Sequence, residues 1–228
     1  MAKKKAEKKG FSFSKVGGLL DNITKKVPVI IESEVKNRRF IDTGVYLLNA
    51  ALSAKMLDGG IEYGKIFTVA GDSGTGKTFI ALSVVKNAQK NGMGVIYIDT
   101  EYSLRLDDLP KYGVDNDPEK FKLIRGNKVE DINILLTQLL DELKEEKLKN
   151  GDIDPFLIVL DSVGQMSSNK EKTDLISGNL KVDMTRAKAL AAMFRSINTD
   201  LGFLDIPMVV CNHVYLEQGS MYPRQIIK

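Results

Sequence analysis

A glycine-rich segment at residues 71–78 has the composition and spacing of a phosphate-binding loop. It fits the pattern G-x-x-x-x-G-K-[S/T]. Its glycines let successive backbone N–H groups turn inward around a phosphate, and the following helix adds the positive end of its dipole. Lys77 is expected to reach the β- and γ-phosphates, and the Thr78 hydroxyl to ligate Mg²⁺. The segment therefore predicts an ATP and magnesium site formed by Gly71, Asp72, Ser73, Gly74, Thr75, Gly76, Lys77 and Thr78.

Two carboxylates complete the predicted chemistry of this site. Asp161 closes the apolar run Phe-Leu-Ile-Val-Leu and is expected to hold Mg²⁺ through water or a hydroxyl. ATP hydrolysis also needs a group that orients or activates water. The residue after Asp161 is Ser162 rather than glutamate, so we look to the end of a neighbouring strand. Glu101 stands there, two residues beyond a predicted strand, with Asp99 as the second candidate base.

The elements that must position these residues alternate along the chain. Runs rich in β-branched residues predict five strands, at residues 66–70, 95–99, 121–124, 156–161 and 207–211. Helical spacing of apolar residues predicts helices at residues 78–90, 106–112, 129–149 and 182–198. Residues 164–181 are expected to form a long loop, and residues 214–228 show no pattern. This order predicts an α/β fold with a mostly parallel sheet and helices on both faces.

Composition limits the other functions that the chain could have. The 228 residues include one cysteine, Cys211, and one histidine, His213, which excludes a disulfide framework and clustered cysteine or histidine metal sites. Residues 1–9 hold five lysines and one glutamate, so the rest of the chain has a net charge of about −1. We expect a basic, partly disordered arm and protomer-contact segment at residues 1–37 and an ATPase core at 38–228. No apolar run approaches a membrane span, so we expect a cytoplasmic protein without a membrane partner.

Several motifs together resemble the RecA/RadA recombinase family. They are Ile-Asp-Thr-Gly at 41–44, Tyr-Ile-Asp-Thr-Glu-Tyr-Ser at 97–103, Leu-Asp-Ser-Val-Gly at 160–164, Val-Asp-Met-Thr-Arg-Ala-Lys-Ala at 182–189 and Asn-His at 212–213. The last two are most similar to UvsX-type recombinases of T4-like bacteriophages. The resemblance covers roughly residues 38–228 and implies a RecA-like P-loop ATPase core. It further implies an ATP-dependent recombinase that forms homo-oligomeric helical filaments on single-stranded DNA and exchanges strands with double-stranded DNA.

The resemblance also assigns roles to single residues. Glu101 matches the family's water-activating glutamate, and His213 matches the residue that senses the γ-phosphate and links it to DNA binding. DNA is expected to contact two loops, at about 165–182 and after His213, and the helix between them. Lys188 and Arg195 lie seven residues apart, on one helix face opposite the apolar one. The implied DNA-binding residues are Lys181, Lys188, Arg195 and Arg224. Arg186 is expected instead to pair with Asp183, three residues earlier.

The resemblance also implies where the chain ends relative to family members. Family cores continue past the second DNA loop, whereas Lys228 falls within it, so we expect a core truncated at its C-terminus whose turnover depends on the missing segment.

A RecA-fold hexameric helicase shares the phosphate loop but needs an N-terminal domain that 40 residues cannot form. A nucleotide kinase needs an arginine-rich lid, and residues 164–181 hold no arginine. An ATP-binding accessory fragment without turnover stays open. If the chain is phage-encoded, its compartment is the host-cell cytoplasm.

Overall fold

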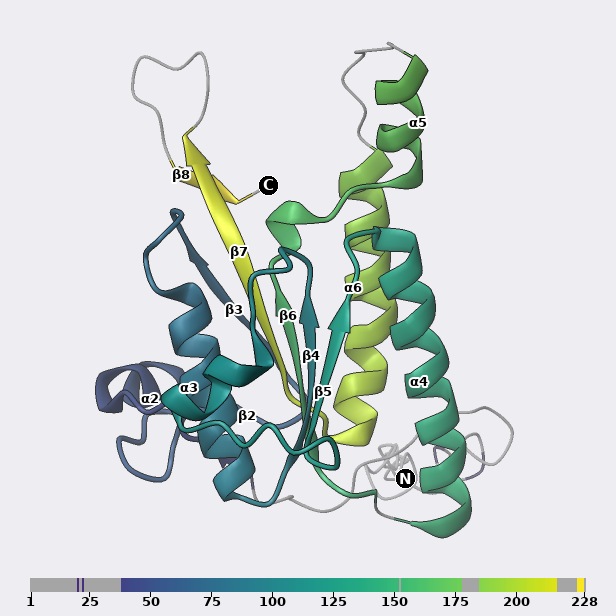
Figure 1. Ribbon diagram of the computed structural model, residues 1–228. Coiled ribbons are helices and arrows are strands. Elements are labelled where there is room, and N and C mark those ends of the chain that lie inside the picture. The colour runs from purple at the N-terminus through teal and green to yellow at the C-terminus, as the bar shows by residue number, and fades with distance from the viewer. Residues whose placement is uncertain are drawn as a thin grey trace, which may run out of the picture. The chain divides into compact units, whose positions relative to one another are not determined.

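The computed structural model describes residues 38–151, 153–177, 185–216 and 225–227, together with Leu20 and Asn22. The chain divides into two units, Met1–Asn37 and Arg38–Lys228. The second unit contains a mixed set of strands and helices (Figure 1). Its strands are β1 (Phe40–Ile41), β2 (Ile61–Glu62), β3 (Ile66–Gly71), β4 (Gly94–Asp99), β5 (Phe121–Arg125), β6 (Phe156–Asp161), β7 (Met208–Leu216) and β8 (Gln225–Ile227). Its α-helices are α2 (Tyr46–Ser53), α3 (Lys77–Lys90), α4 (Val129–Asn150), α5 (Asn169–Ser177) and α6 (Thr185–Leu204), and the 3-10 helices are η1 (Leu106–Tyr112) and η2 (Val163–Gln165).

The main sheet has the strand order β3-β7-β6-β4-β5, and every pair along this path is parallel. The pairing register places Gly71 beside His213 and Asp99 beside Asp161. The carboxyl ends of parallel strands share one edge of a sheet, and in open α/β sheets ligands bind at that edge. The register therefore brings the phosphate loop and the predicted carboxylates to the same edge.

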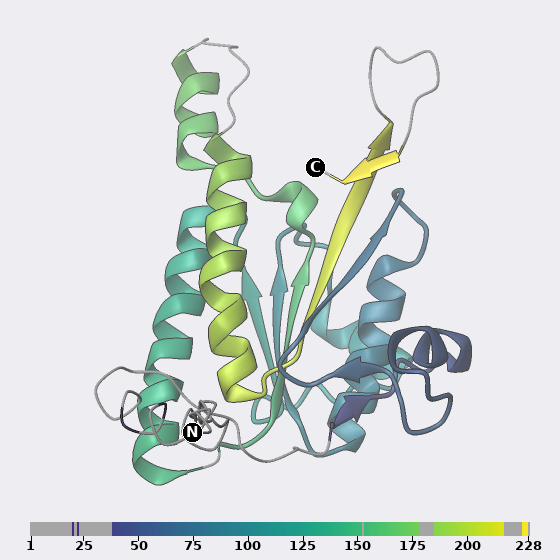
Figure 2. The same cartoon turned by 180° about the vertical axis from the view of Figure 1, so that it is seen from behind.

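Helices cover both faces of this sheet, as the two opposite views show (Figures 1 and 2). On one face α3 buries Ala81, Leu82, Val84, Val85 and Ala88 in a cluster with side chains of β4 and β6. On the other face α4 and α6 bury a second cluster, which includes Leu136, Leu140, Met193, Ile197 and Leu201. The sheet is apolar on both sides, as a parallel sheet between helices must be. The predicted α/β fold with helices on both faces is confirmed.

Residues 164–181 were expected to form a loop, and for part of this segment that prediction is wrong. Residues 169–177 form α5, and residues 178–184 lie outside the described part of the chain. The helix begins with a reciprocal cap: Ser168 N–H donates to Glu171 Oε2 at 2.9 Å, and Glu171 N–H donates to Ser168 Oγ at 3.1 Å. This capping box satisfies two donors at the helix start. The signal was present in the sequence as Ser-x-x-Glu.

The last strand of the parallel sheet is also longer than predicted. β7 continues through His213 to Leu216 instead of ending at Cys211, and residues 225–227 form β8. The reason is pairing on both sides, because Gly71 lies beside His213 and Val214 pairs antiparallel with Ile227. His213 is therefore a strand residue, and residues 214–216, which were expected to begin the second DNA loop, belong to the same strand. The region predicted as the helix 106–112 is the 3-10 helix η1.

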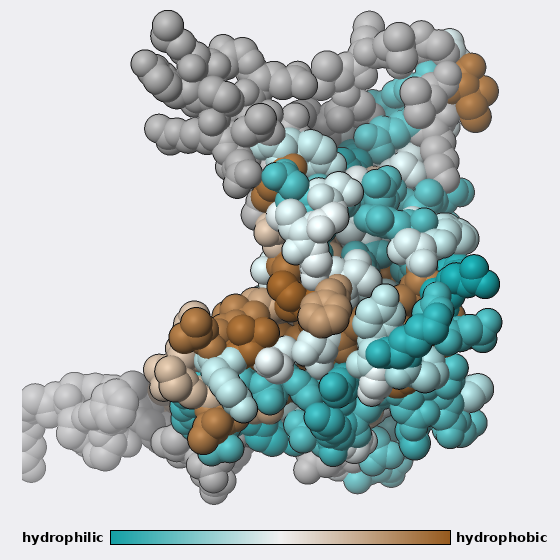
Figure 3. All heavy atoms as spheres, turned by 60° about the vertical axis from the view of Figure 1, so that its left-hand side comes forward, coloured by the Kyte–Doolittle hydropathy of each residue, from teal (hydrophilic) through white to brown (hydrophobic). Residues whose placement is uncertain are grey.

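One face of the core exposes several large apolar side chains. Figure 3 brings the side of α2 and α3 forward and shows apolar side chains gathered there. Those of α2 and the segment after it are Tyr46, Leu47, Leu52, Met56 and Leu57. Contiguous exposed apolar surface of this kind commonly marks a protein contact. Among the described residues, no helix is both long and apolar enough to span a membrane.

Candidate active site

The phosphate loop joins β3 to α3 at the carboxyl edge of the sheet. Gly74 and Gly76 have φ angles of +75° and +88°. A Cβ at either position would meet no heavy atom within 4 Å, so glycine is required by the left-handed backbone and not by lack of space. The Thr75 hydroxyl donates to the Asp72 carbonyl at 2.8 Å and closes the turn. The loop thus has the conformation in which backbone N–H groups form an anion-binding concavity.

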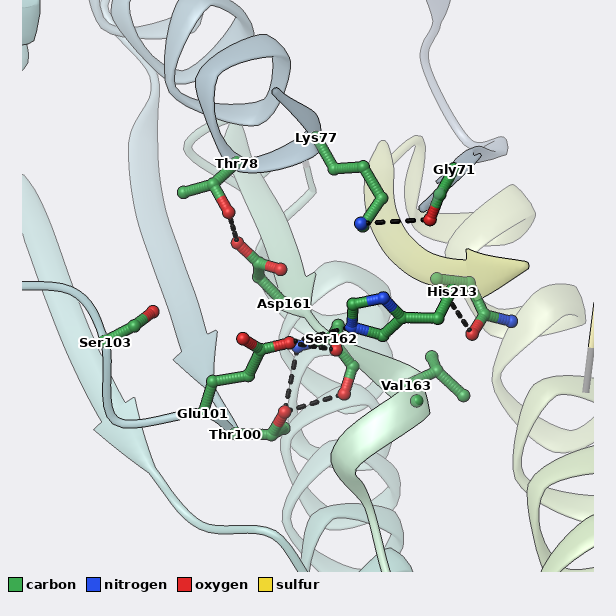
Figure 4. Close-up of polar contacts among 12 residues, drawn as sticks. Gly71, Lys77, Thr78, Thr100, Glu101, Ser103, Asp161, Ser162, Val163 and His213 are labelled. Atoms are coloured by element: carbon green, nitrogen blue, oxygen red, sulfur yellow. Dashed lines mark hydrogen bonds and ion pairs between the residues drawn. The ribbon is translucent and has the colours of Figure 1, made fainter. Parts of the chain in front are cut away.

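Lys77, the first residue of α3, is buried although it carries an ammonium group. Its Nζ donates to the carbonyl oxygens of Gly71 and Asp72, at 3.0 and 2.8 Å. These bonds hold the ammonium group against the phosphate loop (Figure 4). Lys77 therefore brings a fixed positive charge to the position where the loop would bind phosphate.

Asp161, at the end of β6, is a buried carboxylate whose Oδ2 accepts two hydroxyl hydrogen bonds. Thr78 Oγ1 donates to it at 2.7 Å and Tyr97 Oη at 2.8 Å. Burial raises the pKa of the Tyr97 hydroxyl well above its usual value, and the negative charge of Asp161 adds to this effect. Burial and the same carboxylate also raise the pKa of the Cys211 thiol. The Tyr97 hydroxyl and the Cys211 thiol beside Asp161 therefore stay protonated.

These oxygens fit the magnesium ion that the sequence implies. Mg²⁺ prefers hard oxygen ligands and is commonly bound by one or two carboxylates together with substrate phosphates. Thr78 Oγ1 and Asp161 Oδ2 are already within 2.7 Å of each other and lie next to the phosphate loop. The residues that would hold the ion are therefore Thr78 and Asp161.

Glu101 lies beyond the end of β4 and points toward Ser162 and His213 (Figure 4). Ser162 Oγ donates to Glu101 Oε1 at 2.6 Å, and His213 Nε2 lies 3.1 Å from the same oxygen. Partial burial raises the pKa of Glu101, but the hydrogen bonds from Ser162 and His213 and the charges of His213 and Lys77 outweigh it, so the pKa is lowered overall. Among the described residues, none donates a hydrogen bond to Oε2. Glu101 is thus a carboxylate with one oxygen fixed and the other available to a water molecule.

The loop that carries Glu101 is shaped by Asp99. This carboxylate is almost completely buried and accepts hydrogen bonds from the backbone N–H groups of Glu101, Ser103 and Leu104, at 3.1, 3.3 and 3.0 Å. Arg125 Nε lies 4.0 Å from it and Arg125 Nη2 donates to the Leu104 carbonyl at 2.7 Å. Asp99 therefore positions Glu101 and is not placed to act as the alternative base.

His213 packs against a turn that the sequence did not connect with it. A Cβ on Gly164 would lie 2.5 Å from His213 Cδ2, so only glycine admits the imidazole ring in this position. Arg186 Nη2 donates to the carbonyl oxygens of Val163 and Gly164, each at 3.0 Å, and holds this 3-10 turn. The expected partner of Arg186, Asp183, lies outside the described residues. The sequence motifs contain Gly164 and Arg186 but did not predict their contacts with His213 and with the 3-10 turn.

The predicted DNA contacts lie on a separate element. Lys188 and Arg195 are exposed on α6, whose opposite face buries Leu190, Met193 and Ile197. Arg195 Nε donates to the Ala191 carbonyl at 3.2 Å, one turn earlier. Lys181 and Arg224 fall outside the described residues. The structure therefore places two of the four predicted residues, Lys188 and Arg195, on a solvent-facing surface of α6.

Comparison with known proteins gives a consistent likeness. The model of the family described as the RecA N-terminal domain matches residues 23–225. The chain is 26% identical over 190 residues to the "Recombination and repair protein" of Enterobacteria phage T4, covering 82% of this chain and 45% of that protein. It is 29% identical over 188 residues to "Protein RecA" of Sulfurovum sp. (strain NBC37-1), covering 79% and 47%. For "Protein RecA" of Bdellovibrio bacteriovorus the identity is 28% over 192 residues, covering 84% and 46%. The chain spans about half the length of the curated relatives it matches.

Proposed function

The chain belongs to the RecA N-terminal domain family, and from this premise we propose that it is the ATPase core of a DNA recombinase. The proposed protein binds Mg²⁺ and ATP, hydrolyses ATP when single-stranded DNA is present, and forms filaments that pair and exchange DNA strands. The name of the T4 relative, a recombination and repair protein, supports this role. A hexameric helicase is not favoured, because the relatives named above are recombination proteins or RecA.

One observation carries the proposal: two carboxylates with different partners lie at the ends of paired strands, on the edge of the sheet that carries the phosphate loop. Asp161 accepts from Thr78 and lies next to the loop, whereas Glu101 is held by Ser162 and His213. ATP hydrolysis by a P-loop protein needs a carboxylate that holds the metal ion and a separate group that orients or activates the attacking water, and these two carboxylates can fill the two roles. This arrangement favours a site of turnover over a site that only binds nucleotide.

The mechanism follows from these positions. The loop N–H groups and Lys77 bind and orient the phosphates, and Thr78 and Asp161 hold the metal ion. When bound, Mg²⁺ neutralises negative charge on the phosphate oxygens. Glu101 Oε2 accepts a proton from a water molecule whose oxygen bonds to the γ-phosphorus as the bond from that phosphorus to the β–γ bridging oxygen breaks and ADP leaves, while Ser162 and His213 keep Oε1 fixed. The lowered pKa of Glu101 keeps this base ionised at neutral pH.

The same contacts connect hydrolysis with DNA. His213 touches Glu101 with its ring and belongs to β7, which continues to Leu216. A change in the backbone of β7 would therefore move a direct partner of the water-activating carboxylate. Lys188 and Arg195 supply positive charge on α6 for the phosphates of single-stranded DNA, which proteins bind largely by such contacts. The exposed apolar side chains of α2 support self-association into a filament.

Lys77→Ala tests the nucleotide site. Removal of the ammonium group should abolish Mg-ATP binding, because a phosphate cluster needs its fixed countercharge at this position. Binding of a fluorescent ATP analogue by the 228-residue chain is the measurement, and a thermal melt checks the fold. Lys86→Ala, farther along α3, is the matched control and should bind as the parent does. Normal nucleotide binding by Lys77→Ala would contradict the assignment of the loop.

ATP hydrolysis with and without single-stranded DNA separates the functions. A recombinase core should hydrolyse faster when DNA is added, whereas a nucleotide kinase should not respond. Nucleotide binding that persists while turnover is absent with and without DNA would show that the 228-residue chain binds ATP and by itself does not hydrolyse it.

The double variant Lys188→Ala, Arg195→Ala tests the DNA surface. Each lost phosphate contact should lower the slope of log affinity against log salt by about 0.7 for single strands. ATP binding measured without DNA should not change. Lys144→Ala is the matched control, because this lysine pairs with Asp141 and Asp200 and is not assigned to DNA. A salt slope equal to that of the parent would mean that the two residues only face solvent.

A further inference from the structure

Tyr97 is a buried tyrosine in the middle of β4 whose hydroxyl the mechanism above does not use. Its exposure is 1%, and its ring packs against Phe121 with the two ring centroids 6.0 Å apart. A polar group this deep in a core needs a hydrogen-bond partner. The partner is Asp161 Oδ2, at 2.8 Å. Tyr97 therefore contacts the carboxylate assigned to the metal ion from within the core.

The strand register explains how this contact arises. Tyr97 lies beside Val159 in the parallel pair of β4 and β6. Asp161 is two residues farther along β6, so its side chain lies on the same face of the sheet as that of Val159. A long aromatic side chain can span the diagonal distance to such a neighbour. The hydroxyl thus reaches Asp161 from a rigid strand, whereas Thr78 reaches it from the first turn of α3.

The two hydroxyls that donate to Asp161 Oδ2 differ in whether they can keep this hydrogen bond when Mg²⁺ and nucleotide are bound. Thr78 Oγ1 is assigned as a magnesium ligand, so it has two competing uses. Tyr97 Oη has one partner among the described residues, and its place in the packed sheet does not depend on the phosphate loop. Partners in the outer shell of a metal site orient the ligands and commonly affect metal affinity about 10–100-fold.

We propose that Tyr97 is a positioning residue that holds the Asp161 carboxylate in the orientation that binds Mg²⁺. This inference rests on the proposed nucleotide site and adds to it a role for Tyr97 that no motif assigns. It predicts that the hydroxyl of Tyr97 affects the Mg²⁺ requirement of nucleotide binding and leaves the metal-independent part of that binding unchanged.

The test compares the parent chain with Tyr97→Phe, which keeps the ring against Phe121 and removes only the hydroxyl. A fluorescent ATP analogue is held at fixed concentration while Mg²⁺ is titrated, and its binding is also measured in EDTA. The Mg²⁺ midpoint of Tyr97→Phe should rise by about 10-fold or more, and the affinity in EDTA should stay the same. Tyr63→Phe is the matched control, since the Tyr63 hydroxyl donates to Met93 Sδ at 3.1 Å, away from the site, and its midpoint should not move.

A double-mutant cycle with Asp161→Asn tests whether Tyr97 affects Mg²⁺ binding through Asp161. If Tyr97 acts through Asp161, Tyr97→Phe should add little to the Mg²⁺ midpoint of Asp161→Asn. An unchanged or lowered midpoint in the single variant, or additive effects in the double variant, would overturn the inference. Equal losses of binding with metal and in EDTA would overturn it too, because they indicate a structural role alone. Absence of nucleotide binding in the parent chain at every Mg²⁺ concentration is a separate result, which would count against the proposed function itself.

Discussion

Asp161 and Glu101 lie at the ends of two paired strands, yet the fold holds them by different means. Asp161 is the last residue of β6 and only 6% exposed, and its partners come from α3 and from the adjacent strand β4. Glu101 lies two residues past β4 with its side chain 32% exposed. Its partners, Ser162 and His213, are 61 and 112 residues away along the chain. Asp161 is therefore part of the regular sheet, whereas Glu101 lies in a loop and is held by hydrogen bonds from Ser162 and His213.

This difference indicates which half of the site tolerates change. The orientation of Asp161 follows from strand register and from packing, which resist small perturbations because the interior is close-packed. The orientation of Glu101 depends on Asp99, which bonds the loop backbone, and on the turn that seats His213. We therefore expect hydrolysis to be lost more easily than nucleotide binding, and three variants examine that expectation.

Glu101→Gln should have the largest effect. The amide keeps the size of the side chain and loses the proton acceptor, so kcat should fall by about 10²–10⁴-fold. Nucleotide affinity should change little, because Asp161 and the phosphate loop are untouched. Single-turnover hydrolysis alongside equilibrium binding is the measurement. Hydrolysis at the parent rate would place the base elsewhere and remove the distinction between the two carboxylates.

Gly164→Ala should have an intermediate effect without altering either carboxylate. The new Cβ would lie 2.5 Å from His213 Cδ2, so the ring or the turn must move. A misplacement of about 1 Å can cost about 100-fold in rate, and we expect a loss of up to this size in kcat with nucleotide affinity preserved. In Gly202→Ala the new Cβ would meet Gly64 O at 3.8 Å, an ordinary contact, which makes it the matched control. If the Gly164→Ala and Gly202→Ala variants hydrolyse ATP equally fast, the packing of His213 against Gly164 does not affect turnover.

Ser162→Ala should have the smallest effect, seen mainly in the pH profile. Partial burial raises the pKa of Glu101, and the Ser162 hydrogen bond is the first of the contacts that lower it. Without that bond the pKa should rise, and because the base works only when deprotonated, the acid limb of kcat should move to higher pH. At neutral pH the loss should be about fivefold or less, since one hydrogen bond contributes about 1 kcal/mol. A limb that stays in place or moves to lower pH would contradict the role assigned to the Ser162 hydroxyl.

The sequence by itself predicted the part of this protein in which neighbouring residues cooperate. The phosphate loop, the strand before it and the helix after it are local patterns. All five parallel strands were predicted, four of them within one residue of their observed bounds, whereas β7 was predicted too short. The capping box of Ser168 and Glu171 is equally local, so the start of α5 is also encoded by neighbouring residues. Glu101 was predicted from its place just beyond a neighbouring strand, whereas the role of His213 came only from resemblance to a family.

Tertiary structure decided everything that depends on register and on close approach. Tyr97 reads in the sequence as one more residue of an apolar strand, and only its pairing with β6 shows that its hydroxyl meets Asp161. β7 extends past Cys211, where it pairs with β3 through His213 and with β8 through residues 214–216. Gly164 matters because an imidazole from a strand far along the chain packs against it. Local patterns arise from the short-range preferences of the backbone and of hydrogen-bonded caps, whereas these contacts exist only after distant segments have been packed at distances of a few ångströms.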